Sequence, residues 1–159
     1  MYCCHLDTPI GRLMLVGDGD RLHEIRFPNA DHEPALGWRT NAAALDAPRR
    51  QLDAYFEGRR KTFDLQLDWR GTAFQVLVLR ALTQIPYGST RSYGAIAQQI
   101  GRPKAVRAVG AANARNPIPI VVPCHRVIGA DGQLTGFGGG IDTKAVLLRH
   151  EAQVLSAAA

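Results

Sequence analysis

Cys124 and His125, which directly follow Pro123, are the residues whose types most clearly suggest chemistry. A cysteine attacks through its thiolate, and because the pKa of a free thiol is about 8.5, a nearby base or cation must lower it. An adjacent histidine helps only where the fold turns its ring towards the sulfur, directly or through a water. The alternative is a buried structural cysteine beside a chance histidine. The proline-rich approach at 116–123 and the glycine-dense loop at 136–140 favour a rigidly presented site with close backbone approach.

Two other groups of side chains could take part in chemistry. Glu151 offers a carboxylate that could orient His125, although a solvated surface pair with His150 is the simpler interpretation. The run Cys3-Cys4-His5 lacks the C-x₂₋₄-C spacing of zinc sites. We therefore expect these three residues to belong to an ordinary N-terminal strand.

Two short helices around a glycine-containing turn, at 92–100 and 103–114, have the layout of a helix-turn-helix. An αα-hairpin in an ordinary core is the alternative. The small residues of the second helix leave a smooth face that could enter a groove or serve tight helix packing. Basic residues cluster nearby, as phosphate contacts require: Arg102, Lys104, Arg107 and Arg115.

The elements that must position these residues fall into two parts. In the first, strands at 13–16 and 22–27 flank the turn at 17–20 and predict a β-hairpin. A helix is predicted over 47–57. The alternation of apolar and polar residues at 63–67 predicts a half-buried strand.

The second part is predicted to be mostly helical. Apolar residues at helical spacing from Phe74 to Ile85, Leu77 among them, predict a core-facing helix. Ser92 is the predicted N-cap of the next helix, and Pro103 suits the first turn of the helix that follows.

The end of the chain contains an expected extended segment and a helix. Three prolines within 116–123 predict an extended backbone there. A last helix is predicted from Ile141 to about Leu155.

Composition limits the class of protein. The chain has 159 residues, of which 46% are hydrophobic and 21% charged, close to the globular average, so extensive disorder, collagen and a disulfide-dense scaffold are excluded. No apolar run approaches the ~18 residues of a membrane span, and no secretory signal is visible. The net charge of +5 is compatible with a polyanionic partner. Three cysteines, two of them adjacent, favour a reducing, cytoplasmic setting over a disulfide framework.

The residues around Cys124 also carry a family resemblance. The run 123–128, Pro-Cys-His-Arg-Val-Ile, resembles the O6-alkylguanine-DNA alkyltransferases, the direct-reversal DNA repair proteins. The likeness covers almost the whole chain and is strongest from Gly71 to Glu151. Further motifs stand in family order and at family-like spacing: Asp7-Thr8-Pro9-Ile10-Gly11, Leu22-His23-Glu24-Ile25, Ile85-Pro86-Tyr87-Gly88, Arg91-Ser92-Tyr93-Gly94, Arg107-Ala108-Val109-Gly110, the run 116–129 and Leu147-Leu148-Arg149-His150-Glu151.

The resemblance implies both a fold and an activity. An α/β N-terminal domain with a small antiparallel sheet, residues 1–70, would pack on a mostly α-helical C-terminal domain with a helix-turn-helix, residues 71–159. The protein would bind duplex DNA through the minor groove, flip out the alkylated guanine and transfer its O6-alkyl group irreversibly to Cys124. Such a protein is consumed in one turnover. A monomer without cofactor is expected, while O4-alkylthymine repair and cooperative assembly on DNA stay open.

The resemblance also implies roles at the reacting centre. Cys124 would be the nucleophile, His125 would take its proton through a water, and Glu151 would hold and polarise His125. Asn116 would order the turn that presents the cysteine. Tyr93 would donate a proton or hydrogen bond to the departing guanine.

DNA and base contacts follow from the same resemblance. Arg107 would fill the gap left by the flipped base. The small residues Ala105, Ala108 and Gly110 would lie in the minor groove. Further contacts to DNA would come from Ser92, Arg102, Lys104 and Arg115. The carbonyls of Cys124 and Val127 and the backbone around Gly138 would contact the guanine base.

Some positions depart from the family pattern. Leu77 and Leu79 stand where Arg and Trp are frequent, and we interpret both as packing changes on the core helix. Gly138 occupies a position that is Ser in some relatives, so only the backbone contact carries over. Some relatives bind zinc in the N-terminal domain; His23 fits one ligand position, but Asp18 stands where a Cys is needed, so we expect no zinc.

Three other functions compete with this interpretation. Non-catalytic alkyltransferase-like lesion binders typically carry Trp in place of the reactive cysteine, whereas Cys124 is present here. DNA-binding regulators fused to this domain carry an extra Cys-rich zinc module, for which 159 residues leave no room. A Cys-His hydrolase would turn over, and a single-turnover stoichiometry would exclude it.

Overall fold

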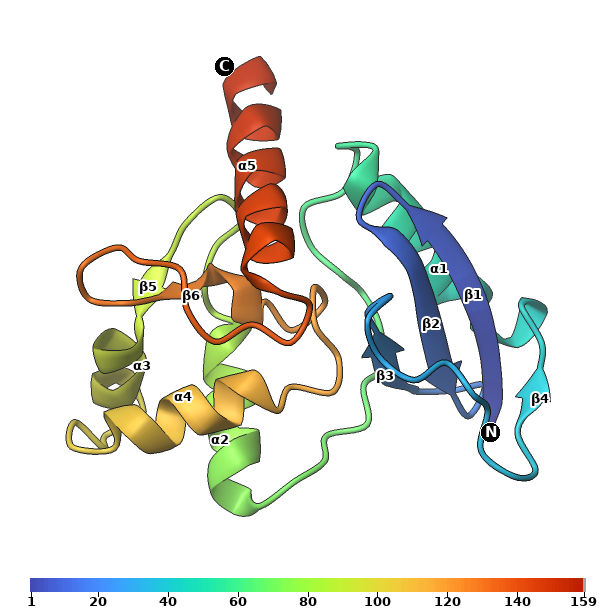
Figure 1. Cartoon of the computed structure of the whole chain (residues 1–159), viewed down its shortest axis with the longest axis horizontal. Helices are drawn as coiled ribbons and strands as arrows, with labels where there is room; N and C mark the ends of the chain where they lie inside the picture. The colour runs from blue at the N-terminus through green and yellow to red at the C-terminus, as the bar shows by residue number, and fades with distance from the viewer. Residues whose placement is uncertain (159) are drawn as a thin grey trace. The chain divides into compact units, whose positions relative to one another are not determined.

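A four-stranded sheet forms the centre of the first of two compact units, Met1–Trp69, in a computed structural model that describes residues 1–158. The strands are β1 (Tyr2–Thr8), β2 (Gly11–Gly17), β3 (Leu22–Arg26) and the short β4 (Arg39–Thr40), in the order β3-β2-β1-β4 (Figure 1). The pairs β1–β2 and β2–β3 are antiparallel, whereas β4 adds a short parallel edge to β1. The predicted hairpin and the N-terminal strand are therefore confirmed.

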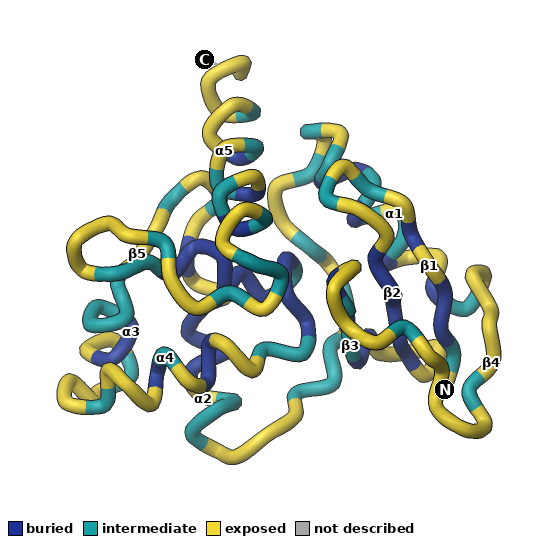
Figure 2. The backbone as a smooth tube through the Cα atoms, viewed as in Figure 1, coloured by how far each residue is buried: buried dark blue, intermediate teal, exposed yellow. Residues whose placement is uncertain are grey.

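The central strand β2 is buried on both faces of the sheet, from Leu13 to Val16. Figure 2 shows this buried stretch in dark blue. On one face Met14 and Val16 pack with Cys3 against Trp38. The 3-10 helix η1 (Ala43–Leu45) and helix α1 (Asp46–Phe56) also contact the sheet, so the helix predicted at 47–57 is confirmed.

The strand predicted at 63–67 is wrong. Only Leu67 pairs, in an isolated bridge with Leu22 that is flanked by backbone hydrogen bonds from Leu22 to Gln66 and from Asp68 to Leu22. Alternating apolar and polar residues indicate that one side of a segment is buried. A strand also needs a hydrogen-bonded neighbouring strand along its length. Here β3 pairs with the segment only through Leu22.

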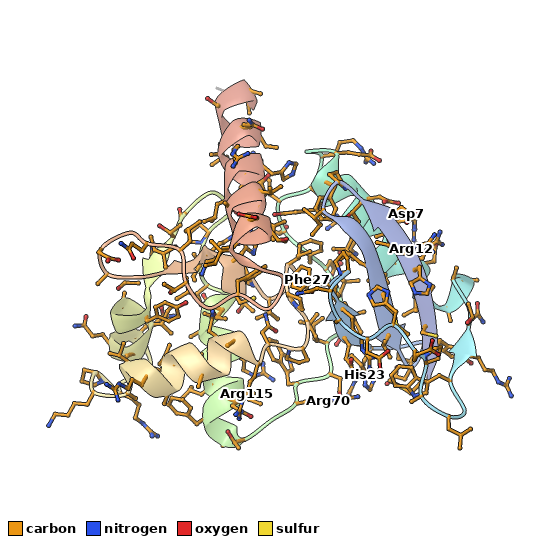
Figure 3. All side chains as sticks on the ribbon, in the orientation of Figure 1. Asp7, Arg12, His23, Phe27, Arg70 and Arg115 are labelled. Carbon is orange, nitrogen blue, oxygen red and sulfur yellow. The ribbon has the colours of Figure 1, made fainter. Side chains whose placement is uncertain are left out.

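Several charged side chains of this unit form hydrogen-bonded pairs with one another. His23 lies between two carboxylates, with Nε2 2.8 Å from Asp18 Oδ2 and Nδ1 3.2 Å from Asp68 Oδ2. Arg12 Nε donates to Asp7 Oδ1 across β1 and β2 at 3.0 Å; both of these residues and His23 are labelled in Figure 3. Asp18, which stands where zinc-binding relatives need a Cys, is thus a hydrogen-bond partner of His23.

The second unit, from Arg70 onward, is built from helices around a two-stranded parallel sheet. Its strands are β5 (Arg91–Ser92) and β6 (Val127–Ile128). The helices are α2 (Ala73–Leu82), α3 (Tyr93–Gln99), α4 (Val106–Ala114), the 3-10 helix η2 (Cys124–Arg126) and α5 (Ile141–Ala158). A helix-rich unit with a small sheet unit before it confirms the expected fold class.

Helix α2 begins with a capping box, in which Thr72 accepts from the Gln75 amide and the Gln75 side chain accepts from the Thr72 amide. The helix ends at Leu82, three residues before Ile85, which lies in a following turn. Leu79 is buried in the core, as expected. Leu77 is 40% exposed, so its assignment to the core stripe is wrong.

Helices α3 and α4 form the helix-turn-helix layout and contact each other. Ser92 caps α3 by accepting a hydrogen bond from the Ala95 amide at 3.0 Å, which confirms the predicted cap. Pro103 lies in the connecting turn, because α4 begins only at Val106. The predicted start of this helix is therefore three residues early.

Residues 116–123 form a tight turn, and the predicted extended segment is wrong. Val121 and Val122 donate to the carbonyls of Pro119 and Ile118, each at 2.9 Å. Ile120 adopts a φ of 73°, which is strained for a β-branched residue. Hydrogen bonds that close on the segment itself overcome the extended preference of residues before proline.

The last helix, α5, confirms the prediction at 141–155 and extends it to Ala158. Its inward face carries Lys144, Leu147 and Glu151, which are buried at spacings of three and four residues. Its C-terminal turns are exposed, as the yellow tube in Figure 2 shows. Within residues 1–158, none of the helices combines the length and hydropathy of a membrane span.

Candidate active site

The thiol of Cys124 lies in the first residue of η2, and the residue is 4% exposed. The turn at 116–123 directly precedes Cys124, and the Cys124 amide donates to the Val122 carbonyl at 2.8 Å. The Cys124 carbonyl accepts from Asn113 Nδ2 of α4 at 3.4 Å. The thiol is free, as are those of Cys3 and Cys4 in the first unit.

The Asn116 side chain stabilises the turn before Cys124 through hydrogen bonds to the backbone of that turn. Its Oδ1 accepts from the Ile118 amide at 3.0 Å, and its Nδ2 donates to the Val122 carbonyl at 2.8 Å. These two bonds satisfy backbone groups on both sides of the strained Ile120. An amide side chain can do this because it carries both an acceptor and a donor.

His125 is fully buried and contacts Glu151 of α5, with Nε2 2.7 Å from Oε2. A carboxylate partner fixes a proton on Nε2, so Nδ1 carries the free lone pair. Among the described residues, Nδ1 has no hydrogen-bond partner. The ring is therefore oriented so that Nδ1 can accept a proton.

The Glu151 carboxylate forms hydrogen bonds with Gly88, His125 and Arg126. The Gly88 amide and Arg126 Nε donate to Oε1 at 3.0 and 2.9 Å, and His125 Nε2 and Arg126 Nη2 reach Oε2 at 2.7 and 3.0 Å. Arg126 also donates to the Ile85 carbonyl at 2.9 Å. This arrangement ties η2, α5 and the segment before β5 to one buried anion.

Burial and these partners set the protonation states. Burial lowers the pKa of His125, although Glu151 opposes this shift. Burial alone would raise the pKa of Glu151, but hydrogen bonds from His125 and Arg126 hold it far below its usual range. Burial raises the pKa of the Cys124 thiol to about 11, against the opposing effects of the Asn116 side chain and the Lys144 ammonium. The resting site therefore holds a thiol, a neutral imidazole and a carboxylate.

Tyr93 begins α3 and is joined to the glycine-rich loop. Its hydroxyl donates to the Thr135 carbonyl at 3.2 Å and lies 3.4 Å from the Thr135 hydroxyl. Strand β5 next to it pairs with β6, so that Ser92 lies opposite Ile128 and Arg91 opposite Val127. Tyr93 therefore directly follows β5, the strand that pairs with β6 and its buried Val127.

The outer face of α4 carries the residues expected to meet DNA. Arg107, Ala108 and Arg115 are exposed on this helix and its C-cap, and Arg115 is labelled in Figure 3. Arg102 and Lys104 are exposed in the preceding turn. Ala105 and Gly110 are half-buried, and a Cβ at Gly110 would stand 3.8 Å from the Tyr93 ring, so this edge of α4 adjoins Tyr93.

The remaining predicted residue, Gly138, is exposed in the loop before α5, and a Cβ there would meet nothing within 4 Å. The structure brings Cys124, Asn116, His125 and Glu151 together through direct bonds and neighbouring positions.

Three site residues escaped the sequence analysis: Asn113, Arg126 and Lys144. Arg126 was part of a recognised motif without a role, although it donates two hydrogen bonds to Glu151. Lys144 could have been found from its spacing, because it lies three and seven residues before Leu147 and Glu151 on the inward stripe of α5. A charged residue on a core-facing stripe indicates a buried polar contact.

Comparisons with known proteins cover both units. Residues 1–69 match the family described as 6-O-methylguanine DNA methyltransferase, ribonuclease-like domain, and residues 73–153 match the DNA binding domain of the same name. A methylated-DNA--protein-cysteine methyltransferase of Mycobacterium leprae is 51% identical over 95% of this chain and 92% of its own length. One from Methanosarcina acetivorans is 49% identical over 95% and 98%.

Solved structures agree with these matches. The Mycobacterium tuberculosis OGT in complex with DNA superposes with a TM-score of 0.92 at 50% identity, covering 97% of this chain and 94% of that one. The O6-methylguanine-DNA methyltransferase of Pyrococcus kodakaraensis gives a TM-score of 0.68 at 25% identity, covering 94% and 98%. Both domain matches and these full-length relatives lead to one conclusion: the chain belongs to the 6-O-methylguanine DNA methyltransferase family.

Proposed function

We propose that this protein repairs DNA by transferring the alkyl group of O6-alkylguanine irreversibly to Cys124. The observation that carries the proposal is the buried contact between His125 and Glu151, directly after the buried Cys124 in the chain, in which His125 Nδ1 has no hydrogen-bond partner among the described residues. Relatives at about half identity are named methylated-DNA--protein-cysteine methyltransferases, which supports the same reaction here. Three free thiols suit a monomer that acts in the reducing cytoplasm.

The proposed reaction conserves atoms and charge. His125 takes the thiol proton, through a water, and Glu151 stabilises the imidazolium that forms. The thiolate attacks the alkyl carbon, a C–S bond forms, and the C–O6 bond breaks with its electron pair moving to guanine. Guanine takes up a proton with the help of Tyr93, so the products are a thioether and an unmodified base. Because a thioether is a poor leaving group towards water, Cys124 is not regenerated.

Charge distribution supports DNA as the substrate. The second unit contains ten Lys and Arg against three Asp and Glu, whereas the first contains nine against eleven, so the excess of positive charge lies entirely in the unit with α4. The exposed basic residues around α4 would contact phosphates, and Ala108 would allow close approach in the minor groove. We propose that Arg107 fills the space of a flipped guanine, because it is exposed on the same helix whose edge adjoins Tyr93.

A serine substitution at the nucleophile tests this proposal. Cys124→Ser removes the thiolate and keeps the size of the side chain, so binding to duplex DNA should persist while alkyl transfer is abolished. Matched Cys3→Ser and Cys4→Ser variants remove other buried thiols in the first unit and should transfer normally once folded. Transfer that survives in Cys124→Ser would overturn the proposal.

A further inference from the structure

The hydroxyl of Tyr93 is engaged by one residue of the loop before α5, Thr135. The Tyr93 hydroxyl donates to the Thr135 carbonyl at 3.2 Å, and the Thr135 hydroxyl donates back to the Tyr93 oxygen at 3.4 Å. A phenol oxygen can donate one hydrogen bond and accept others, so Thr135 uses both capacities at once. Within residues 1–158, no other group forms a hydrogen bond with this hydroxyl. The proposed reaction uses Tyr93 but assigns Thr135 no role.

The surroundings of Tyr93 keep its hydroxyl next to this loop. Tyr93 is half-buried at the start of α3, and its ring lies beside α4, where a Cβ at Gly110 would stand 3.8 Å away. On the hydroxyl side, a Cβ at Gly136 would stand 3.6 Å from the Tyr93 oxygen. Gly136 has a φ of 54°, which glycine adopts without strain. The backbone at 135–136 therefore lies directly against the Tyr93 hydroxyl.

The Thr135 carbonyl has a second donor, which allows the Tyr93 proton to turn away from it. Lys144 Nζ donates to the same carbonyl at 2.9 Å. When the Tyr93 hydroxyl turns to another acceptor, the Thr135 carbonyl therefore keeps a hydrogen bond, and no buried acceptor is left unsatisfied. The Thr135 hydroxyl can stay on the Tyr93 oxygen during this change, because it is the donor in that contact.

We propose that Thr135 is a positioning residue that orients Tyr93 and strengthens its hydrogen bond to the departing guanine. This inference rests on the proposed function, in which guanine leaves with the electron pair of the broken C–O6 bond. The negative charge on guanine attracts the Tyr93 proton, and negative charge then develops on the Tyr93 oxygen. The Thr135 hydroxyl keeps its own proton and stabilises that oxygen as a donor. Hydrogen bonds linked in such a chain strengthen one another.

A double-mutant cycle tests this role. Thr135→Val removes the hydroxyl but keeps the branched shape and the backbone carbonyl, and Tyr93→Phe removes the phenol oxygen. The rate of single-turnover transfer from a duplex containing O6-methylguanine is measured for the parent chain, the two single variants and the double variant. Thr135→Val should slow transfer by about two- to tenfold, the range of one hydrogen bond, in the parent chain, but should cause no further loss in the Tyr93→Phe background. Thr135→Ser keeps the hydroxyl and should transfer at the parent rate.

Two controls separate this role from a structural one. Thr83→Val removes the hydroxyl of another exposed threonine in the second unit, which donates to the Arg80 carbonyl, and should transfer normally. Iodoacetamide alkylates Cys124 without any guanine, so Thr135→Val should leave the rate of that reaction unchanged. The proposal would be overturned if Thr135→Val caused no loss of transfer, an equal loss in both Tyr93 backgrounds, or a lower rate with iodoacetamide.

A second measurement tests the contact in the protein without DNA. N-acetylimidazole acylates tyrosine hydroxyls with release of imidazole, and peptide mass spectrometry gives the rate at each tyrosine. Because the Thr135 hydroxyl occupies a lone pair of the Tyr93 oxygen, Thr135→Val should raise the acylation rate at Tyr93 severalfold, with Tyr2 of the first unit as the internal reference. An unchanged rate at Tyr93 would contradict the proposal. A parent chain that transfers no methyl group would instead refute the proposed function, and the acylation rates would still report whether Thr135 engages Tyr93.

Discussion

At the scale of single residues, Glu151 is the anchor of the candidate active site. It is fully buried, yet hydrogen bonds from His125, Arg126 and the Gly88 amide keep it ionised. A buried charge of this kind is tolerated because its partners satisfy it, and removal of any partner leaves an uncompensated charge. The same contacts that orient the His125 ring therefore also stabilise the second unit.

Replacing Glu151 should lower both the free energy of unfolding and the rate of alkyl transfer. Glu151→Gln keeps the shape but removes the charge, leaving Arg126 buried without its ion pair. We expect a loss of about 3–5 kcal/mol in the free energy of unfolding and a decrease of about 10²-fold in the transfer rate. Urea unfolding and single-turnover kinetics would measure these effects. Glu57→Gln, at an exposed ion pair with Arg59, is the control and should cost less than about 1 kcal/mol.

The pKa shifts of His125 and Glu151 predict how stability depends on pH. The pKa of His125 is lowered by burial, so below its ordinary value of 6.5 the unfolded chain binds a proton that the folded chain does not. The pKa of Glu151 is lowered by its hydrogen bonds, so a second loss begins below its ordinary value of 4.5. The free energy of unfolding should therefore fall as the pH drops through both values. Urea titrations at a series of pH values test this, and a stability maximum at pH 4–5 would contradict it.

At the scale of elements, we propose that helix α4 links DNA binding to access of the alkylated base to Cys124. Its exposed face carries Arg107 and Ala108, while Gly110 at its edge adjoins Tyr93. A side chain that stabilises an extrahelical base is needed only when that base must leave a stack. The role of Arg107 can therefore be separated from the chemistry by a change of substrate.

Arg107→Ala should slow repair of O6-methylguanine in duplex DNA at least about tenfold more than reaction with the free O6-alkylguanine base. Arg80→Ala, which removes an exposed charge from α2, is the matched control and should affect neither substrate strongly. The measurement compares second-order inactivation rates on the two substrates. Equal losses on both would rule out a role for Arg107 in flipping.

Sequence reasoning succeeded where local signals determine the element. Spacing and the Ser92 cap were sufficient for α2 and α3, because caps and amphipathic faces act within a few residues. It failed at 116–123, where hydrogen bonds from the Asn116 side chain and the left-handed Ile120 override the extended preference before proline. The contact between His125 and Glu151 spans 26 residues and followed only from family resemblance. The spacing of Lys144 on α5 could have indicated its burial, but not its partners, Val127 of β6 and Thr135 of the following loop.

At the scale of the whole molecule, the two units differ sharply in charge. The second carries ten basic against three acidic residues, and the first is slightly acidic. Charge that is confined to one unit directs a polyanion to that unit and makes binding depend on salt. The domain order matched by the family models, with the DNA-binding part at 73–153, is consistent with this distribution.

Salt dependence should identify which cations contact phosphates. Affinity for duplex DNA should fall linearly on a log–log plot against salt concentration, and Lys104→Ala or Arg115→Ala should reduce the slope by about one. Lys61→Ala, an exposed cation of the first unit, should leave the slope unchanged. A slope that is unaffected by all three substitutions would place the phosphate contacts elsewhere.

The central claim is that Cys124 accepts one alkyl group and is consumed. Intact-protein and peptide mass spectrometry after incubation with duplex DNA containing O6-methylguanine tests it most directly. We predict one added methyl group per protein, located on Cys124 and absent from Cys3 and Cys4, with the reaction saturating at one equivalent of DNA. A protein that binds the lesion tightly but gains no methyl group, or that repairs many equivalents, would contradict it.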